Sequence, residues 1–138
     1  MATIEVKVQI NAPAEKVWEV VSDIDNEPKF WKGTKEVKNI SKNDNVINRE
    51  ITIAFRDQKC IQEVTLEPEE RIHAKFTKGI INGEKIVSLI PEGETTTLQT
   101  IWDIKLTGMM GMFTGMIKKH IKSGTEQAMN SIKEEIER

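Results

Sequence analysis

Five turn signals interrupt residues 34–106 and divide them into short runs typical of β-strands. Asn82-Gly83 is the strongest signal, because both residues tolerate the positive φ of a tight hairpin turn. Short connections between consecutive strands imply an antiparallel meander. The signals are Asn43-Asp44-Asn45, Arg56-Asp57-Gln58, Glu67-Pro68-Glu69-Glu70, Asn82-Gly83 and Pro91-Glu92-Gly93. The predicted strands are 34–42, 46–55, 59–66, 71–80, 84–90 and 95–106.

The two ends of the chain complete this pattern. Residues 3–10 alternate between apolar and polar, as in a half-buried strand. Residues 13–22 start with a proline suited to a first helical turn and predict a helix, with a short helical turn within 23–29. Residues 109–138 are typical of one long helix. We expect a single α+β domain over residues 1–138, with a seven-stranded antiparallel sheet wrapped around the C-terminal helix and two short helices between the first two strands.

Alternation along the predicted strands separates an inward face from an outward face. The run 59–66 is ambiguous, because Val64 and Leu66 require one parity and Ile61 requires the other. A bulge, or a strand buried on both faces, would resolve this conflict. Elsewhere the predicted inward sets are Ile47, Arg49, Ile51, Ile53 and Phe55; Ile72, Ala74 and Phe76; and Leu98, Thr100, Trp102, Ile104 and Leu106.

Arg49 is the most informative polar residue on these inward faces. A buried guanidinium needs a carboxylate, backbone carbonyls or the polar end of a ligand, because an unpaired buried charge is very costly. Gln62 or Glu63 on the next strand could be its partner, depending on the register. In the alternative interpretation, Arg49 lies at the open rim of the strand and reaches solvent.

The predicted C-terminal helix has an apolar face that is broad at its start and narrow toward its end. Because methionine adapts to irregular space, the flanking methionines fit a cavity mouth, plain core packing or a subunit interface, which leaves a homodimer open. Gly124 is expected where helix and sheet approach most closely. The sheet-facing stripe consists of Met110, Phe113, Ile117, Ile121, Gly124, Ala128 and Ile132, and its flank consists of Met109, Met112 and Met116.

Few residues could carry chemistry. His120 lies about one turn beyond Met116, and could contact a ligand oxygen, act as a general base, or be structural and half-exposed. His73 faces outward by parity, and Cys60 has no histidine in a readable arrangement. These residues lack the spacing of a zinc site. We therefore predict no catalytic residue, no metal site and no cofactor.

Composition limits the classes of partner. The net charge of −2 and the pI of about 5.8 give no general attraction to nucleic acid or to anionic membranes. No apolar run is long enough to span a bilayer, and the start of the chain lacks the apolar stretch of a signal peptide. A single cysteine cannot form an internal disulfide, so a cytoplasmic location is the simplest expectation.

Two segments carry a resemblance to a known family. NAPAEKVWEVVSDIDNEPKFW, at 11–31, places Ala-Pro-Ala and Val-Trp on the first helix and then an Asp, a Pro and a Trp before the next strand. VSLIPEGETTTLQTIWDIKL, at 87–106, joins a strand ending in proline to a threonine-rich strand through a glycine-containing turn. Together with the order of elements, they resemble the START-like superfamily (SRPBCC, the helix-grip fold), in particular its polyketide cyclase/dehydrase and coenzyme-Q-binding-like branch.

The resemblance implies an apolar cavity between the sheet and the C-terminal helix, with the segment around Trp31 at its entrance. Together with the uneven apolar face of the C-terminal helix, it favours binding or transport of a small hydrophobic molecule, such as a lipid, quinone or polyketide-like compound. The scarcity of acid–base candidates in the sequence counts against catalysis. Two alternatives stay open: a polyketide cyclase or dehydratase that uses polar cavity residues, and a module that acts through a protein partner. The expected ligand-binding residues are Arg49, Trp31, Phe76, Trp102, Met109, Met112, Phe113, Met116, Ile117 and His120.

Overall fold

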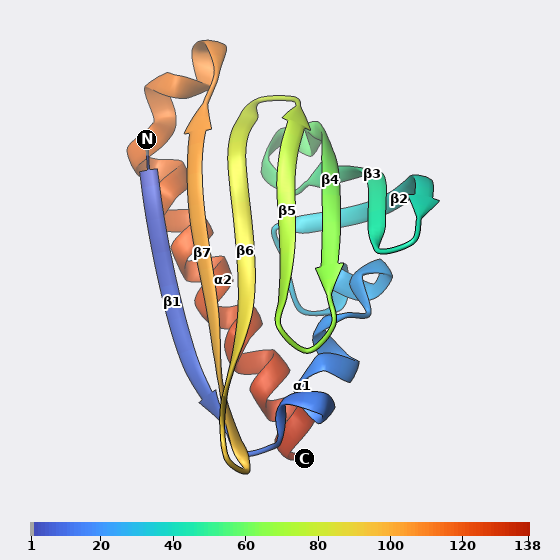
Figure 1. The fold of residues 1–138 in the computed structure, drawn as a ribbon. Helices are drawn as coiled ribbons and strands as arrows, with labels where there is room; N and C mark the ends of the chain where they lie inside the picture. Colours follow the sequence, from blue (N-terminus) through green and yellow to red (C-terminus); the bar gives the residue numbers. More distant parts are fainter. Residues whose placement is uncertain (1) are drawn as a thin grey trace.

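A seven-stranded antiparallel sheet curves around the long C-terminal helix in the computed structural model of the chain (Figure 1). The structure describes residues 2–138, apart from the side chains of Ala2, Met109 and Met110. The elements in chain order are β1 (Ala2–Ile10), α1 (Ala14–Val21), η1 (Ile24–Lys29), β2 (Thr34–Asn43), β3 (Val46–Ile53), η2 (Phe55–Asp57), β4 (Lys59–Glu67), β5 (Arg71–Lys78), β6 (Ile81–Glu92), β7 (Thr95–Leu106), η3 (Gly108–Phe113) and α2 (Thr114–Glu137). The strand order β1-β7-β6-β5-β4-β3-β2 is a meander from β2 to β7, closed by β1. The predicted α+β helix-grip architecture is confirmed.

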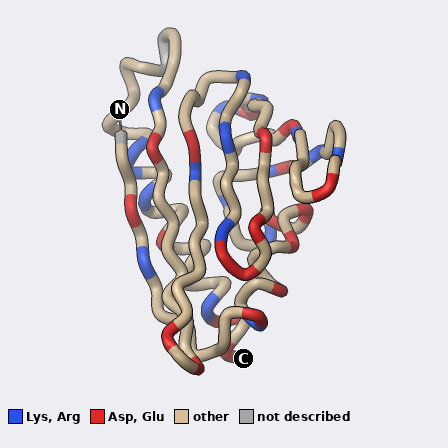
Figure 2. The backbone as a smooth tube through the Cα atoms, in the orientation of Figure 1, with Lys and Arg blue, Asp and Glu red and all other residues tan. Residues whose placement is uncertain are grey.

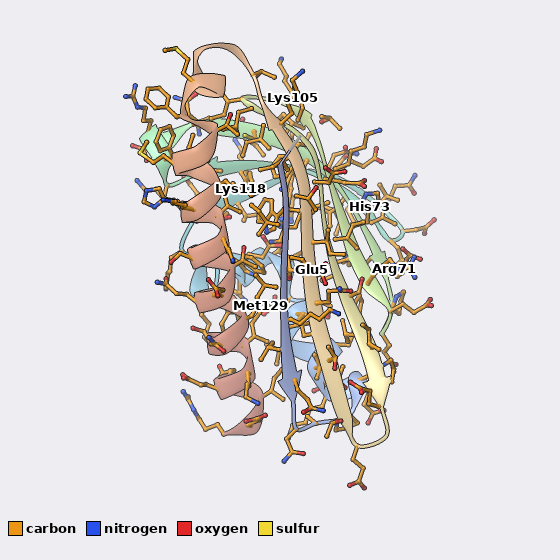
Figure 3. All side chains as sticks on the ribbon, turned by 90° about the vertical axis from the view of Figure 1, so that its left-hand side faces the viewer. Glu5, Arg71, His73, Lys105, Lys118 and Met129 are labelled. Atoms are coloured by element: carbon orange, nitrogen blue, oxygen red, sulfur yellow. The ribbon has the colours of Figure 1, made fainter. Side chains whose placement is uncertain are left out.

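Helix α2 lies on one face of the sheet, and Arg71 and His73 lie on the opposite face (Figure 3). In the second half of α2, Met129 and Ile132 are almost fully buried against residues of α1, β1 and β7. In the first half, Ile117 is buried whereas its neighbours on the helix are exposed. The helix is therefore anchored at its C-terminal end and packs loosely near its start.

The C-terminal helix begins later than predicted. The segment η3 is a 3-10 helix, and α2 starts at Thr114 rather than near Met109. Gly108, with φ of +62°, and Gly111 lie within η3, where glycine has a low propensity for an α-helix. Phe113, predicted in the sheet-facing stripe, is 38% exposed. The apolar pattern alone therefore predicted neither the late start of α2 nor the exposure of Phe113.

The expected close approach of helix and sheet at Gly124 is wrong. A Cβ atom placed on Gly124 would have no atom within 4 Å apart from its own chain neighbours and the backbone of its helix. The tightest packing falls about one turn later, where Ala128 is fully buried. Gly124 therefore leaves open space between α2 and the sheet.

The prediction of a hairpin turn at Asn82-Gly83 is also wrong. Strand β6 already begins at Ile81, and Gly83 pairs with both neighbouring strands. The chain turns instead at Gly79, where φ is +124°. Gly83 has φ of +116°, and a Cβ atom there would lie 2.1 Å from the carbonyl oxygen of Asp103. Close backbone approach, and not a turn, is what requires glycine at this position.

The inward faces of the strands follow the predicted parity. Strand β3 ends earlier than predicted, at Ile53, because Arg56 and Asp57 adopt positive φ in η2. Strand β4 alternates regularly, with Cys60, Gln62 and Val64 buried on one face and Ile61 half-buried on the other, so it contains no bulge. The register shift beside Ile61 falls in β5, where Thr77 is the extra residue. The predicted inward residues that are buried are Ile47, Arg49, Ile51, Ile72, Ala74, Phe76, Leu98, Thr100, Ile104 and Leu106.

Charged residues of both signs are mixed along the whole chain (Figure 2). Within residues 2–138, no helix combines the length and the apolar character that crossing a membrane requires.

Gly83→Ala should strongly destabilise the fold. Its Cβ would collide with the Asp103 carbonyl in the middle of the β6–β7 pairing. We expect the free energy of unfolding to fall by about 2–4 kcal/mol. Gly93→Ala is the matched control, because Gly93 also has positive φ but has nothing within 4 Å of its Cβ position. The control should cost about 1 kcal/mol, and equal losses in urea unfolding would contradict the steric argument.

Candidate functional site

A cavity of about 370 Å³ lies between the sheet and the first half of α2. Strands β3 to β7 supply its floor, the segment around Trp31 supplies one side, and α2 supplies the roof. Gly124 is one of its lining residues, so the open space beside this glycine belongs to the cavity. The volume falls within the range of about 300–1,000 Å³ that is typical of small-molecule sites.

Four aromatic residues line the cavity, and three of them, Trp31, Phe76 and Trp102, pack together into an aromatic wall. The ring centroids of Trp31 and Trp102 are 6.4 Å apart in an edge-on arrangement, and Phe76 stacks beside Trp102 at 6.2 Å. The indole Nε1 of Trp102 donates a hydrogen bond to Thr125 Oγ1 at 3.0 Å. Thr125 in turn donates to the carbonyl oxygen of Ile121 at 2.7 Å. This chain of bonds connects the aromatic wall to α2 and fixes the orientation of Trp102.

Arg49 holds the polar end of the site together. Its side chain is 2% exposed, and its Nη2 donates to both carboxylate oxygens of Glu27 at 2.9 Å. Its Nε donates to Gln62 Oε1 at 2.9 Å and its Nη1 to the carbonyl oxygen of Ile24 at 3.2 Å. The alternative of a solvent-exposed rim position is therefore wrong, and Gln62 is the partner on the next strand. Arg49 contacts protein groups and does not line the cavity, whereas Glu27 and Gln62 do.

Lys85 is a cavity residue that the sequence interpretation missed. It points inward from β6, is 7% exposed, and lines the cavity. Its Nζ lies 3.2 Å from the ring centroid of Trp31 and 5.1 Å from that of Trp102, in a cation–π arrangement. The signal was present in the sequence, because Lys85 shares the parity of the apolar residues Val87 and Leu89. The incorrect turn at 82–83 placed Lys85 at the start of the strand and concealed this.

Burial lowers the pKa of Lys85 to about 8, because the charged form loses its hydration. The nearby carboxylate of Glu27 acts in the opposite direction and raises this pKa, while the positive charge of Arg49 lowers it further. The ammonium is therefore a charged group of unusual acidity inside an otherwise apolar wall.

The remaining predicted site residues lie in three places. Ile117 and His120 line the cavity from α2, with the His120 side chain exposed at its edge. Met112, Phe113 and Met116 are 81%, 38% and 48% exposed and are not among the lining residues. The side chain of Met109 lies outside the described part of the structure. The structure thus brings the aromatic residues, Ile117 and His120 together at the cavity, whereas the exposed apolar side chains of η3 and of the first turn of α2 do not line it.

The other residues that could take part in chemistry lie away from the cavity wall. His73 Nε2 lies 2.6 Å from Glu84 Oε2 on the outer face of the sheet (Figure 3). Burial raises the pKa of the Cys60 thiol, which disfavours the reactive thiolate. In the part of the chain that the structure describes, no three His, Cys, Asp or Glu side chains are grouped as a metal site would need.

A family model described as polyketide cyclase / dehydrase and lipid transport matches residues 1–137. The chain belongs to this family. The START-like resemblance inferred from the two sequence segments is therefore confirmed. Comparison with curated proteins gives no match.

Solved structures share the fold at low sequence identity. The protein TTHA0849 from Thermus thermophilus is 16% identical, with a TM-score of 0.84 over 98% of this chain and 97% of its own. The Zhui aromatase/cyclase from Streptomyces sp. R1128 is 17% identical, with a TM-score of 0.81 over 99% and 94%. A START superfamily protein from Mycobacterium smegmatis is 20% identical, with a TM-score of 0.68 over 90% and 94%. At these identities the similarity establishes the fold alone.

Glu27→Gln should destabilise the protein, because it leaves the buried Arg49 guanidinium without its counter-ion. We expect a loss of about 3 kcal/mol in the free energy of unfolding, measured by urea denaturation. Asp57→Asn is the control, since it removes the charge from an ion pair with Lys35 in which both side chains are more than half exposed. The control should leave stability nearly unchanged. Equal stabilities of the Glu27 variant and the wild type would show that the buried pair does not hold η1 on the sheet.

Lys85 should make the stability of the protein depend on pH. Between the folded pKa of about 8 and the ordinary value of 10.5, the unfolded chain keeps a proton that the folded protein has released. The free energy of unfolding therefore rises with pH across this window. Relative to Lys85→Met, the wild type should gain up to about 3 kcal/mol between pH 8 and 10.5. Urea unfolding of both proteins across this range measures the gain, and parallel pH profiles would contradict it.

Proposed function

We propose that this protein binds a small hydrophobic molecule in the cavity beneath α2 and carries out no chemistry on it. The observation that carries the proposal is the cavity itself, with a volume of about 370 Å³ and a wall of Trp31, Phe76 and Trp102. Burial of apolar ligand surface contributes about 25 cal/mol per Å², before the cost of ordering the ligand. Membership of a family described by both cyclase/dehydrase activity and lipid transport is consistent with such a ligand.

The polar groups of the cavity favour binding over catalysis. General acid–base chemistry needs a positioned pair of groups that can exchange protons with the substrate. Both carboxylate oxygens of Glu27 already accept hydrogen bonds from Arg49, which keeps this carboxylate engaged within the protein. His120 is exposed at the cavity edge and has no hydrogen-bond partner among the described residues that would orient its ring. The proposed role of these groups is therefore to hold the ligand or the fold.

Trp31 and Trp102 allow binding to be measured directly, because two of the three tryptophans of the chain line the cavity. The neutral apolar probe N-phenyl-1-naphthylamine should accept energy from them and brighten on entering the cavity. Saturable binding with one site per chain supports the proposal. A linear, non-saturable signal would overturn it.

Gly124→Leu should block the cavity without harming the fold. The new side chain would start from an open position on the cavity roof, and leucine favours a helix over glycine by about 0.5–1 kcal/mol. We expect probe affinity to fall at least about tenfold, which corresponds to about 1.4 kcal/mol, while stability is kept or increased. Gly115→Leu is the matched control, because Gly115 lies on the same helix with equally open space but does not line the cavity. Unchanged affinity in the Gly124 variant would place the probe elsewhere.

A further inference from the structure

The charges around the cavity do not balance. Glu27 and Arg49 neutralise each other through two hydrogen bonds of 2.9 Å. Lys85 adds a second positive charge beside this pair. Both members of the pair affect its pKa, which Glu27 raises and Arg49 lowers. The polar end of the cavity therefore carries one uncompensated positive charge. An isolated charge in an apolar environment is costly unless it finds a counter-ion.

Lys85 has aromatic neighbours in place of that counter-ion. The described residues give its ammonium no hydrogen bond or ion pair, only the faces of Trp31 and Trp102. Throughout the described part of the chain, each side-chain nitrogen or oxygen that is sealed from solvent has a hydrogen-bond partner. The ammonium is therefore not sealed, and Lys85 lines both the cavity and a small void beside it.

We propose that the cavity selects an apolar molecule that carries a single carboxylate, which lies against the ammonium of Lys85. This inference rests on the proposed ligand-binding function and names the class of ligand. The carboxylate supplies the missing negative charge and accepts a charge-assisted hydrogen bond, which is stronger than a bond between neutral groups. The apolar remainder of the molecule lies along the aromatic wall and under Gly124.

A single negative charge fits this site better than two. The cavity surroundings offer one excess positive charge, and a dianion such as a phosphate monoester would carry an unpaired charge into the apolar wall. The other titratable groups that face this region are Glu27, His120 and, on the side of α1, Asp23, which borders a water-sized void of about 20 Å³ next to Lys85. His120 and Asp23 are exposed and hydrated, so neither replaces the ligand as a partner.

The test compares three ligands of equal chain length: decanoate, decan-1-ol and decyl phosphate. The two anions are kept below their critical micelle concentrations and the alcohol below its solubility limit. Binding is followed by the fluorescence of the tryptophans at neutral pH. We expect decanoate to bind at least about tenfold more tightly than decan-1-ol, and more tightly than decyl phosphate. In Lys85→Met, decanoate should lose this advantage while decan-1-ol binds as before. Lys105→Met removes an exposed lysine from the neighbouring strand β7 and should keep the preference.

A second measurement needs no variant. In the wild type, the preference for decanoate over decan-1-ol should shrink as the pH rises above about 8, where the Lys85 ammonium loses its proton and the carboxylate does not change. Equal affinities for the two ligands in the wild type, or a preference that survives in Lys85→Met, would overturn the carboxylate inference and leave the binding function standing. Failure of every decyl ligand and of the neutral naphthylamine probe to bind would overturn the binding function as well.

Discussion

The contacts of the Arg49 guanidinium connect three parts of the molecule that the chain itself leaves separate. Arg49 lies on β3. It donates hydrogen bonds to Glu27 and Ile24 of η1 and to Gln62 of β4. Without the Arg49 guanidinium, η1 would be held to the sheet mainly by apolar contacts. The backbone N–H of Trp31 donates to the carbonyl oxygen of Glu27 at 2.7 Å, so the position of this indole depends on the same anchor. The position of Trp31 in the aromatic wall therefore depends on the ion pair between Arg49 and Glu27.

The cavity exists because α2 packs tightly on the sheet in its second half, whereas in its first half Ile117 is its only buried residue before Thr125 among those the structure describes. Ala128 and Met129 are buried tightly, and Thr100 donates a hydrogen bond to the Met129 sulfur at 3.1 Å. Toward the start of the helix, the bond from Trp102 to Thr125 is the last polar connection before the open space at Gly124. Space of this size persists because its walls are stiff: the sheet is hydrogen-bonded throughout and the tryptophans are fixed by their partners.

Most of the fold could be predicted from the sequence, because alternation and turn residues are local signals. The incorrect predictions concern positions where contacts between distant segments determine the local conformation. Asn82-Gly83 has the composition of a hairpin turn, but the close approach of the Asp103 carbonyl uses the glycine within a strand. The inward parity of Arg49 was readable, and its partner Glu27 was not, since the two are joined only through the docking of η1. The exposure of Phe113 follows from the 3-10 segment η3, which helical periodicity cannot foresee.

Lys85 shows how a residue that weakens the fold can define the site. An apolar side chain at this inward position would pack between the tryptophans without the cost of burying a charge. The cation–π contacts with Trp31 and Trp102 recover part of that cost, about 2 kcal/mol where the ammonium is desolvated. They supply no acceptor for its N–H donors, and the described structure gives these donors no protein acceptor either, although Lys85 lines the cavity. Under the proposed binding function, a ligand in the cavity would meet the single positive charge of Lys85, because Arg49 and Glu27 beside it neutralise each other.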